Sequence, residues 1–324
     1  MEPYAGVREQ YVRFADEARE DSPCFLEWGL GVADDPDVLA WIAALPGLKK
    51  QPNLVFAAAR WHGVAAPGPY AGLRAALLGD DGSIRATIMA RSTQTNEVGR
   101  LATLLPAFVH AIPVGEVALI EVGASAGLNL FPDRWGYAWS TPTGPVTLGG
   151  EPRLDCAVTG PAPLPLRLPE IAWRCGIDLN PLSVADDDAM AWLATLVWPE
   201  QDARRERLAR AVEVARRDPP RLVAGDLLAE LRPLVAEASA HGTVLVFHSA
   251  VAAYLPVPDR ERMFATMREL VADGCHWVSN EAPGIFPEVS AAAPPPTPRR
   301  FELAVDGRVV AHTHGHGADL AWLG

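Results

Sequence analysis

The chain has few of the residues on which several common functions depend. Only two of its 324 residues, Lys49 and Lys50, are lysines, and its 28 basic and 40 acidic residues give a formal net charge of −12. Proteins that bind polyanions need clustered Lys and Arg side chains to neutralise the phosphates. We therefore expect no nucleic-acid partner, and we interpret the arginine-rich segment 204–217 as a helix with a solvated face.

Cysteine and long apolar runs are also scarce. The four cysteines are widely spaced and form no Cys-x-x-Cys pair, so neither a zinc cluster nor a redox motif is predicted. No segment approaches the roughly 20 apolar residues that span a bilayer. The first residues also lack a basic stretch followed by an apolar one. We expect reduced thiols, no membrane partner and a cytoplasmic location.

Apolar residues are abundant and, in the first third of the chain, follow helical spacing. They make up 49% of the sequence, which is ample for a folded core. In residues 4–18 they recur at intervals of three and four, the pattern of an amphipathic helix. Ser22 and Asp35 each precede a proline, a combination typical of helix starts. We predict a helical N-terminal domain over residues 1–112 and a second domain over residues 113–324.

The most informative segment follows these helices. Residues 117–120 are an apolar run typical of a strand that is covered on both faces of a parallel sheet. Glu121 and a turn of small residues come next, and glycine lets such a turn bend sharply without side-chain bulk. We expect outward-facing N–H groups and a helix start here, an arrangement that holds the carboxylate or phosphate end of a cofactor. The turn residues are Gly123, Ala124, Ser125, Ala126 and Gly127.

The residue pattern of this turn distinguishes two classes of cofactor. Dinucleotide-binding turns usually read Gly-x-Gly-x-x-Gly, with an acidic residue about 20 positions later. From Glu121 to Gly127 the chain reads acidic-x-Gly-x-Ser-x-Gly, which resembles motif I of the class I methyltransferases that bind S-adenosylmethionine. The resemblance implies that these residues bind this cofactor. The alternative is an ordinary tight connection between a strand and a helix.

Two later strands are predicted to end in acidic residues. A strand over residues 173–178 ends in Asp178, where a ribose diol would meet a two-oxygen acceptor, and Leu179 follows it at the cofactor. A strand from residue 221 ends at Asp226, which the methyltransferase resemblance places beside the adenine. The alternative for Asp226 is the N-cap of a helix, because an apolar helical segment follows it.

The remaining strands complete the predicted fold class. Residues 243–249 and 275–281 are predicted as a fourth and a fifth strand, and residues 301–312 as a hairpin around Asp306-Gly307. Strands separated by helical stretches imply a parallel sheet. We therefore predict an α/β fold: a Rossmann-like methyltransferase sheet with a C-terminal β-hairpin, preceded by a helical domain.

A closer resemblance covers nearly the whole chain. The segments that carry it are residues 51–58, 93–100, 121–130, 178–181 and 246–249. Together they resemble an uncharacterised bacterial family, domain of unknown function 2332. The resemblance implies an S-adenosylmethionine-dependent methyltransferase fold without an established substrate.

The chain departs from the wider superfamily in one spacing. Glu121 and Asp178 are 57 residues apart, whereas a simple strand-helix-strand unit would separate them by about 20. The intervening chain must therefore contain an insertion. We place it at about residues 131–170 and expect it to form a lid or an extension of the sheet.

Candidate catalytic residues follow the last two parallel strands. Methyl transfer from a sulfonium is an in-line displacement, so a base is needed only if the acceptor carries a proton of high pKa. His248 ends the fourth strand and is the predicted base and a cofactor contact. Glu281 is the second catalytic candidate and Asn280 a substrate contact. The alternatives are a histidine bonded at the sheet edge for His248 and a turn cap for Glu281.

A polar cluster before an apolar helix is the predicted acceptor site. It consists of Gln94, Asn96 and Glu97, while Thr95 between them is interpreted as the cap of that helix. Near the end of the chain, His312, His314 and His316 alternate with other residues in a glycine-containing segment. We predict a turn lined with histidines there and no metal site.

These observations favour one function over its rivals. We expect methyl transfer from S-adenosylmethionine to a small molecule. The alternative from a different class is a sensor or scaffold that keeps the fold and the cofactor without transferring a methyl group. A nicotinamide-dependent oxidoreductase is less favoured, because the turn lacks the dinucleotide glycine pattern.

Overall fold

A computed structural model describes residues 6–94, 96–295 and 297–324. The chain forms two compact units. Unit 1 comprises residues 1–95 and 187–206, and unit 2 comprises residues 96–186 and 207–324. Unit 1 is therefore assembled from two separate stretches of sequence. The predicted division into a helical domain over residues 1–112 and a second domain over residues 113–324 stays a prediction.

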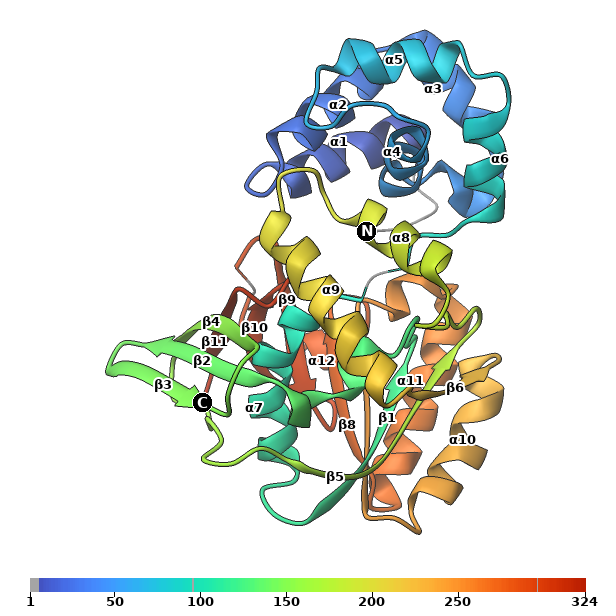
Figure 1. Cartoon of the computed structure of the whole chain (residues 1–324). Coiled ribbons are helices and arrows are strands. Elements are labelled where there is room, and N and C mark those ends of the chain that lie inside the picture. Colours follow the sequence, from blue (N-terminus) through green and yellow to red (C-terminus); the bar gives the residue numbers. More distant parts are fainter. Residues whose placement is uncertain (1–5, 95, 296) are drawn as a thin grey trace. The chain divides into compact units, whose positions relative to one another are not determined.

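Unit 1 is helical, as the apolar spacing predicts. Ser22 and Asp35 cap its second and third helices through side-chain oxygens that accept backbone N–H groups. Residues 4 and 5 of the first predicted helix, and Thr95 of the predicted polar cluster, lie outside the described residues. The elements are α1 (Val7–Ala18), α2 (Pro23–Ala33), α3 (Pro36–Ala43), η1 (Gly47–Lys50), α4 (Pro52–Trp61), α5 (Tyr70–Leu78), α6 (Ser83–Ala90) and α8 (Asp187–Leu196) (Figure 1).

Aromatic packing holds unit 1 together. Phe56 of α4 lies 5.1 Å from Phe25 and 5.3 Å from Trp28 of α2 between ring centroids, both in edge-on geometry. Edge-on pairs of this kind stabilise a core by about 0.5–1.5 kcal/mol each beyond the area they bury. No helix in the described part of the chain is long and apolar enough to cross a bilayer.

Unit 2 contains one sheet of 11 strands among the described residues. The strands are β1 (Glu116–Val122), β2 (Gly136–Thr141), β3 (Gly144–Leu148), β4 (Arg153–Thr159), β5 (Glu170–Asp178), β6 (Arg221–Ala224), β7 (Thr243–Ser249), β8 (His276–Glu281), β9 (Arg300–Val305), β10 (Arg308–His314) and β11 (Asp319–Trp322). Their order across the sheet is β3-β2-β4-β11-β10-β9-β8-β7-β1-β5-β6. The fold is a mixed α/β fold with a large mixed sheet.

The five strands β6, β5, β1, β7 and β8 are parallel neighbours. The chain builds outward from β1 to β5 and β6, and then returns to the other side of β1 with β7 and β8. The strand order therefore reverses between β1 and β7. In open parallel sheets, ligands bind outside the carboxyl ends of the strands at such a switch point.

The rest of the sheet extends this parallel core. The predicted C-terminal hairpin is confirmed, because β9 and β10 pair antiparallel around Asp306 and Gly307, both at positive φ. The predicted insertion contains β2, β3 and β4, which pair with one another and with β11. Of the two expectations for this insertion, the extension of the sheet is confirmed.

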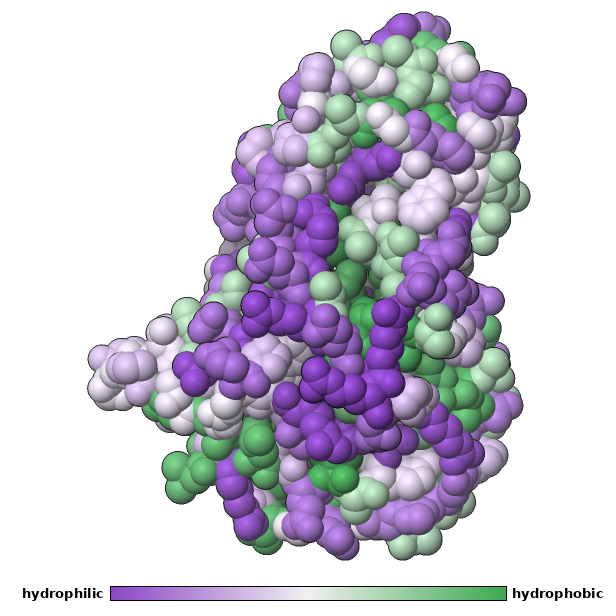
Figure 2. Space-filling view, viewed as in Figure 1, coloured by the Kyte–Doolittle hydropathy of each residue, from purple (hydrophilic) through white to green (hydrophobic). Residues whose placement is uncertain are grey.

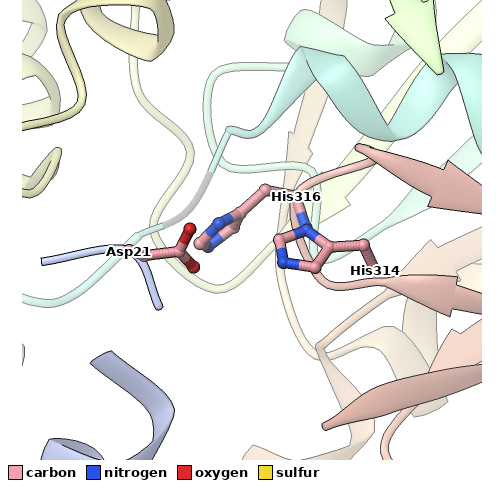
Figure 3. Close-up of side chains that lie close together, drawn as sticks. All are labelled: Asp21, His314 and His316. Carbon is pink, nitrogen blue, oxygen red and sulfur yellow. The ribbon is translucent and has the colours of Figure 1, made fainter. Parts of the chain in front are cut away.

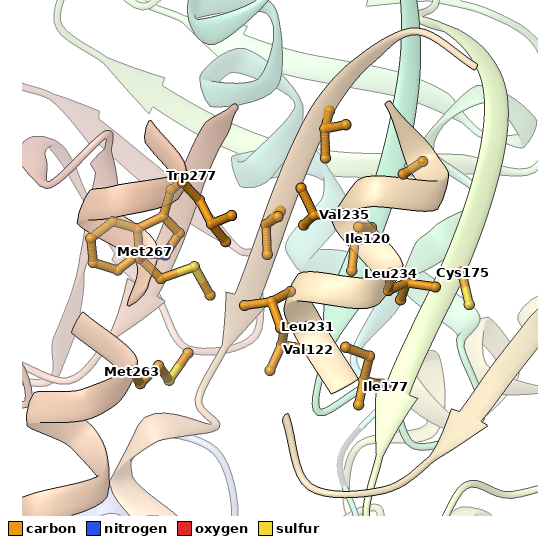
Figure 4. Packing of buried hydrophobic residues seen from close by; sticks show 14 of the residues in the cluster. Ile120, Val122, Cys175, Ile177, Leu231, Leu234, Val235, Met263, Met267 and Trp277 are labelled. Atoms are coloured by element: carbon orange, nitrogen blue, oxygen red, sulfur yellow. The ribbon is translucent and has the colours of Figure 1, made fainter. Parts of the chain in front are cut away.

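The two faces of the parallel core carry different helices. One face, here called the α10–α11 face, packs against α10 (Leu227–Ala238) and α11 (Val257–Ala272). Figure 4 shows Ile120, Val122 and Ile177 of this face beside Leu231 of α10. The opposite face, the α7 face, packs against α7 (Leu101–Ala111), where Phe108 lies 5.1 Å from Phe247 of β7.

The remaining helices are short or exposed. They are the 3₁₀ turns η2 (Val98–Arg100), η3 (Leu128–Leu130), η4 (Pro132–Arg134) and η5 (Ala252–Tyr254), and the α-helices α12 (Pro287–Ser290) and α9 (Asp202–Arg217). Figure 2 shows hydrophilic side chains gathered over α9, while Leu208 and Val212 on its other side are buried. The prediction of a solvated helix face over this segment is confirmed.

Candidate functional site

The candidate site lies where β1, β5 and β7 end. Glu121, one residue before the end of β1, pairs in register with Gly176 of β5 and with Phe247 of β7. The carboxyl ends of these parallel strands therefore meet at one edge of the sheet, next to the switch point. The loops that follow them, and the side chains at their ends, form the site.

The turn after β1 is built on residues in the left-handed backbone region. Gly123, Ser125 and Gly127 have φ angles of 71°, 52° and 69°. The first and third positions suit glycine for this reason, whereas Ser125 adopts a conformation that non-glycine residues rarely take. A Cβ on Gly123 would also lie 2.5 Å from the side chain of Val251. The chain itself therefore needs glycine here, whether or not a ligand binds.

Four N–H groups of this turn, those of Gly123, Ala124, Ser125 and Gly127, are bonded within the protein and do not face outward as predicted, so for them the prediction is wrong. Gly123 and Ala124 both donate to the carbonyl oxygen of Ile177, at 2.8 and 3.0 Å. Ser125 donates to Asp178 at 2.7 Å, and Gly127 donates to Ala124 at 2.7 Å. These bonds tie the turn to the end of β5.

The predicted helix start after the turn is also wrong. The next element is η3, a 3₁₀ turn of three residues, which is too short to supply the aligned dipoles of an α-helix N-terminus. The chain then enters the sheet extension instead of a helix. Bidentate bonds from Arg174 of β5 to Asp133, at 2.8 and 2.9 Å, fix this connection.

Asp178 holds two loops together. One of its carboxylate oxygens accepts from the N–H of Ser125 and the other from the N–H of Asn180, at 2.7 and 2.8 Å. Each oxygen keeps a second lone pair, so Asp178 can still accept from a ribose hydroxyl. Leu179, beside it, is 69% exposed.

Asp226 is exposed and caps α10. Its Oδ1 accepts from the N–H of Leu228 at 2.8 Å. The capping alternative is therefore confirmed. A cap of this kind leaves the second carboxylate oxygen available, and the adenine contact stays a prediction.

Glu121 is the buried carboxyl group of the site. Its side chain points to the α7 face, because it alternates with Ile120 and Val122 of the opposite face. Its Oε1 accepts from Nδ2 of Asn129 at 3.1 Å, while its Oε2 has no hydrogen-bond partner among the described residues. Burial raises the pKa of Glu121 to about 8, and the Asp178 carboxylate also raises it.

Three further buried polar atoms near Glu121 have no partner in the described part of the chain. They are Nδ2 of Asn96, Oγ of Ser125 and Oδ1 of Asn129. Asn96 is fixed beside the turn because its Oδ1 accepts from the N–H of Leu128 at 3.4 Å. Buried polar groups are usually paired, so four unpaired atoms around one turn make it the candidate position for a ligand. Asn129 was missed by the sequence predictions, although it lies within the segment 121–130.

The rest of the predicted acceptor cluster is divided. Gln94 belongs to unit 1, whereas Asn96 and Glu97 belong to unit 2. Glu97 is buried and accepts from the N–H of Gly99 at 3.0 Å and from the guanidinium of Arg207 at 3.2 Å. It therefore supports the loop before α7, and no contact of Glu97 with an acceptor is implied by these bonds.

The surroundings of His248 are those of a residue bonded within the protein and not those of a base. It is completely buried, and its Nε2 accepts from the indole Nε1–H of Trp277 at 3.0 Å. Its Nδ1 must then carry the proton, which it donates to Oε1 of Glu281 at 2.6 Å. Neither ring nitrogen is left to take a proton from an acceptor. The alternative of a histidine bonded within the sheet describes this geometry.

Glu281 and Asn280, at the end of β8, point to opposite faces. Oε1 of Glu281 also accepts from the N–H groups of Val251 and Ala252, so the capping alternative describes this oxygen. Its Oε2 is buried without a partner among the described residues. Asn280 lies on the α7 face, where its side chain bonds Ser249 at 3.0 Å and Thr313 at 2.7 Å.

The alternating histidines lie at the end of β10. His314 and His316 have ring centroids 5.3 Å apart, and the N–H of His316 donates to Nδ1 of His314 at 3.1 Å (Figure 3). His314 is the last residue of β10, and His316 follows it in a turn. His312, two residues earlier in the strand, is buried.

The chain belongs to the family described as "Uncharacterized protein conserved in bacteria (DUF2332)", which matches residues 8–322. This match covers both units, so the helical unit and the sheet unit are parts of one conserved chain. No curated protein and no solved structure matches the chain.

Proposed function

We propose that this protein binds S-adenosylmethionine at the carboxyl ends of β1 and β5 and transfers its methyl group to a small molecule. The strand order β6-β5-β1-β7-β8 supports a Rossmann-like sheet with its switch point beside Glu121. Asp178 at the end of β5 suits the ribose diol, and Asp226 after β6 suits the adenine end.

The unpaired atoms around the β1 turn carry this proposal. An α-amino acid group has an ammonium that donates and a carboxylate that accepts. Glu121 Oε2 and Asn129 Oδ1 are acceptors that suit the ammonium, and Asn96 Nδ2 is a donor that suits the carboxylate. The methionine end of the cofactor carries both groups, which the pyrophosphate of a dinucleotide does not.

The charge of Glu121 favours the same cofactor. A buried carboxylate is costly unless a positive group compensates it. S-adenosylmethionine brings an ammonium and a sulfonium that would compensate the ionised carboxylate, whereas a phosphate would bring no positive charge. The turn also disfavours a phosphate, because that ligand needs several free backbone donors and four N–H groups of the turn are already bonded within the protein.

In this mechanism the protein mainly orients the cofactor and the acceptor and shields them from water. Proton exchange by its side chains has a smaller role. When bound, the cofactor would supply an electrophilic methyl group, whose carbon would bond to the acceptor in line as the C–S bond breaks and S-adenosylhomocysteine leaves. Asp178 and the turn from Gly123 to Gly127 hold the ribose and methionine ends in place, and their mutual hydrogen bonds keep both rigid. Since His248 has no free nitrogen, the reaction suits an acceptor that is nucleophilic without a protein base.

Calorimetry of the full-length chain tests the proposal. Glu121→Gln keeps the shape of the side chain but cannot ionise to balance the bound cation, so we expect cofactor affinity to fall by about tenfold or more. Glu116→Gln, in the same strand but exposed, is the matched control and should bind like the wild type. The wild type should also release about one proton per cofactor at pH 7, because a cation ionises Glu121. Absence of binding in folded wild type, or equal binding in Glu121→Gln, rejects the site.

One observation favours a second function. Both nitrogens of His248 and most N–H groups of the turn are used within the protein, which suits a sensor or scaffold that binds the cofactor without reacting. Incubation with S-adenosylmethionine and candidate acceptors separates the two functions. Cofactor binding without S-adenosylhomocysteine formation in a broad acceptor screen would support the sensor.

A further inference from the structure

A line of buried ionisable side chains crosses β8, β9 and β10. Glu281 pairs in register with Glu302, and Glu302 pairs in register with His312. Directly opposed residues of antiparallel strands share one face, so the three side chains emerge side by side from the α10–α11 face. All three are buried, with exposures of 4%, 6% and 5%.

The polar partners of this line leave two of its atoms unsatisfied. Oε2 of Glu281 and Nε2 of His312 have no hydrogen-bond partner among the described residues. Between them, Oε2 of Glu302 accepts from the hydroxyl of Ser290, at the end of α12, at 2.5 Å. The line therefore offers acceptor atoms to a ligand that brings several donors.

The neighbouring arginine of β9 does not balance the charges of the Glu281 and Glu302 carboxylates. Arg300, two residues before Glu302 in β9, is held by both carboxylate oxygens of Asp319, at 2.9 and 2.8 Å. Two carboxylates directly opposite one another across a strand pair destabilise a sheet unless a positive group compensates them. The ligand that this line suits is therefore a cation.

We propose that Glu281, Glu302 and His312 form a binding site for an organic ammonium group, a protonated primary amine. An ammonium has three donors, which matches the carboxylate oxygens and the imidazole nitrogen of the line. Each N–H···O contact spans about 2.8 to 3 Å, so one ammonium nitrogen reaches acceptors almost 6 Å apart.

A metal ion suits the same atoms less well. Divalent cations lie about 2.0 to 2.6 Å from each ligand atom, which requires ligand atoms that are closer together. In the described part of the chain, Glu281, Glu302 and His312 do not form a group whose ligand atoms all lie within 4.8 Å of one another. The spacing of the line therefore favours the larger reach of an ammonium.

The ammonium site is independent of the proposed cofactor site. Glu121 points to the α7 face, and the line of Glu281, Glu302 and His312 points to the α10–α11 face. Failure of cofactor binding would leave the ammonium site untouched, and the reverse also holds. Glu281 ends β8 at the same edge of the sheet as the switch point, which places the amine site near the ends of the parallel strands.

Titration calorimetry of the full-length chain with putrescine tests this inference. 1,4-Butanediol, which has the same length without charge, and tetramethylammonium, which has charge without N–H donors, are the matched probes. We expect saturable binding of putrescine alone. Glu302→Gln should weaken it by about tenfold or more, whereas Glu288→Gln, exposed in the neighbouring α12, should leave it unchanged.

Several results would overturn the assignment. They are no putrescine binding to folded wild type, equal affinity of Glu302→Gln, or equal binding of tetramethylammonium. Saturable binding of Zn²⁺ or Mn²⁺ that Glu302→Gln abolishes, without putrescine binding, would replace the ammonium by a metal. If Glu302→Gln does not fold, His312→Gln serves instead, and wild-type affinity in that variant would contradict the site.

Discussion

Two buried ionisable side chains at one edge of the sheet, Glu121 and His248, differ in how their polar atoms are paired. On the α7 face, Glu121 has one partner and a cluster of unpaired atoms beside it. On the α10–α11 face, His248 is satisfied on both nitrogens by Trp277 and Glu281. A satisfied network fixes a fold, whereas an unsatisfied one costs free energy that a ligand can recover. This difference, and not the type of residue, separates candidate ligand groups from structural ones.

The strongest test of this difference uses the pH dependence of stability. Folding raises the pKa of Glu121 from 4.5 to about 8, so the folded state holds a proton that the unfolded state releases between these pH values. The contribution of this proton to the free energy of unfolding is fully present below pH 4.5 and is lost as pH rises through about 8. The loss is about 1.4 kcal/mol per pH unit, or about 3 to 5 kcal/mol over the window.

Urea unfolding of wild type and Glu121→Gln from pH 5 to 9 measures this loss. Glutamine does not ionise, so the stability of the wild type relative to the variant should fall as pH rises to about 8 and then level off. Glu116→Gln, whose site is exposed, should follow the wild type throughout. Parallel curves for wild type and Glu121→Gln would show that the carboxyl group is ionised in the folded protein.

On the opposite face, His248→Asn should mainly affect stability. The change removes the acceptor for Trp277 and the ring donor to Glu281, both within a buried network. Unpaired buried groups cost about 1 to 3 kcal/mol each, so we expect a loss of about 2 to 4 kcal/mol in urea unfolding. Cofactor affinity per folded molecule should stay within about twofold, since a structural role predicts no direct contact. A stable variant with much weaker binding would return His248 to the functional site.

A smaller effect, on cofactor affinity, is expected from Asp178, which joins the loops after β1 and β5. In Asp178→Asn one acceptor oxygen becomes an amide nitrogen, so either Ser125 or Asn180 loses its partner. Cofactor affinity should fall by about 1.5 to 3 kcal/mol, through the lost ribose contact and a looser turn. Glu170→Gln, exposed at the start of the same strand, is the control. Calorimetry showing equal affinity in Asp178→Asn and Glu170→Gln would separate Asp178 from the cofactor.

The sequence predicts strand ends well and side-chain partners poorly. The apolar runs before Glu121 and His248 predict β1 and β7, because four or more buried residues in succession suit a covered parallel strand. The face to which each polar residue points, and the bonds it makes, depend on partners far along the chain. His248 is bonded by residues 29 and 33 positions away, and Glu302 meets Glu281 only through the register of β8 and β9.

The turn after β1 shows the same limit at a local scale. Its glycines predict a sharp turn, and in the structure Gly123 and Gly127 have positive φ angles. The helix expected after it is replaced by a 3₁₀ turn, since the chain continues into the extension of the sheet. Tertiary pairing of that extension outweighs the local tendency of a strand-to-helix turn.

The smallest expected effect concerns Asp226 and separates a helix cap from a cofactor contact. Its Oδ1 accepts from the N–H of Leu228, and loss of such a cap costs about 1 kcal/mol. Asp226→Ala should therefore lower the free energy of unfolding by about that amount, and Asp226→Ser, which keeps a capping oxygen, should restore most of it. An adenine contact predicts a different pattern in calorimetry, because both variants lose the carboxylate oxygen that faces the ligand and should bind S-adenosylmethionine less tightly. Wild-type affinity in Asp226→Ser and Asp226→Ala would leave Asp226 as a cap alone and confine the cofactor to the ends of β1 and β5.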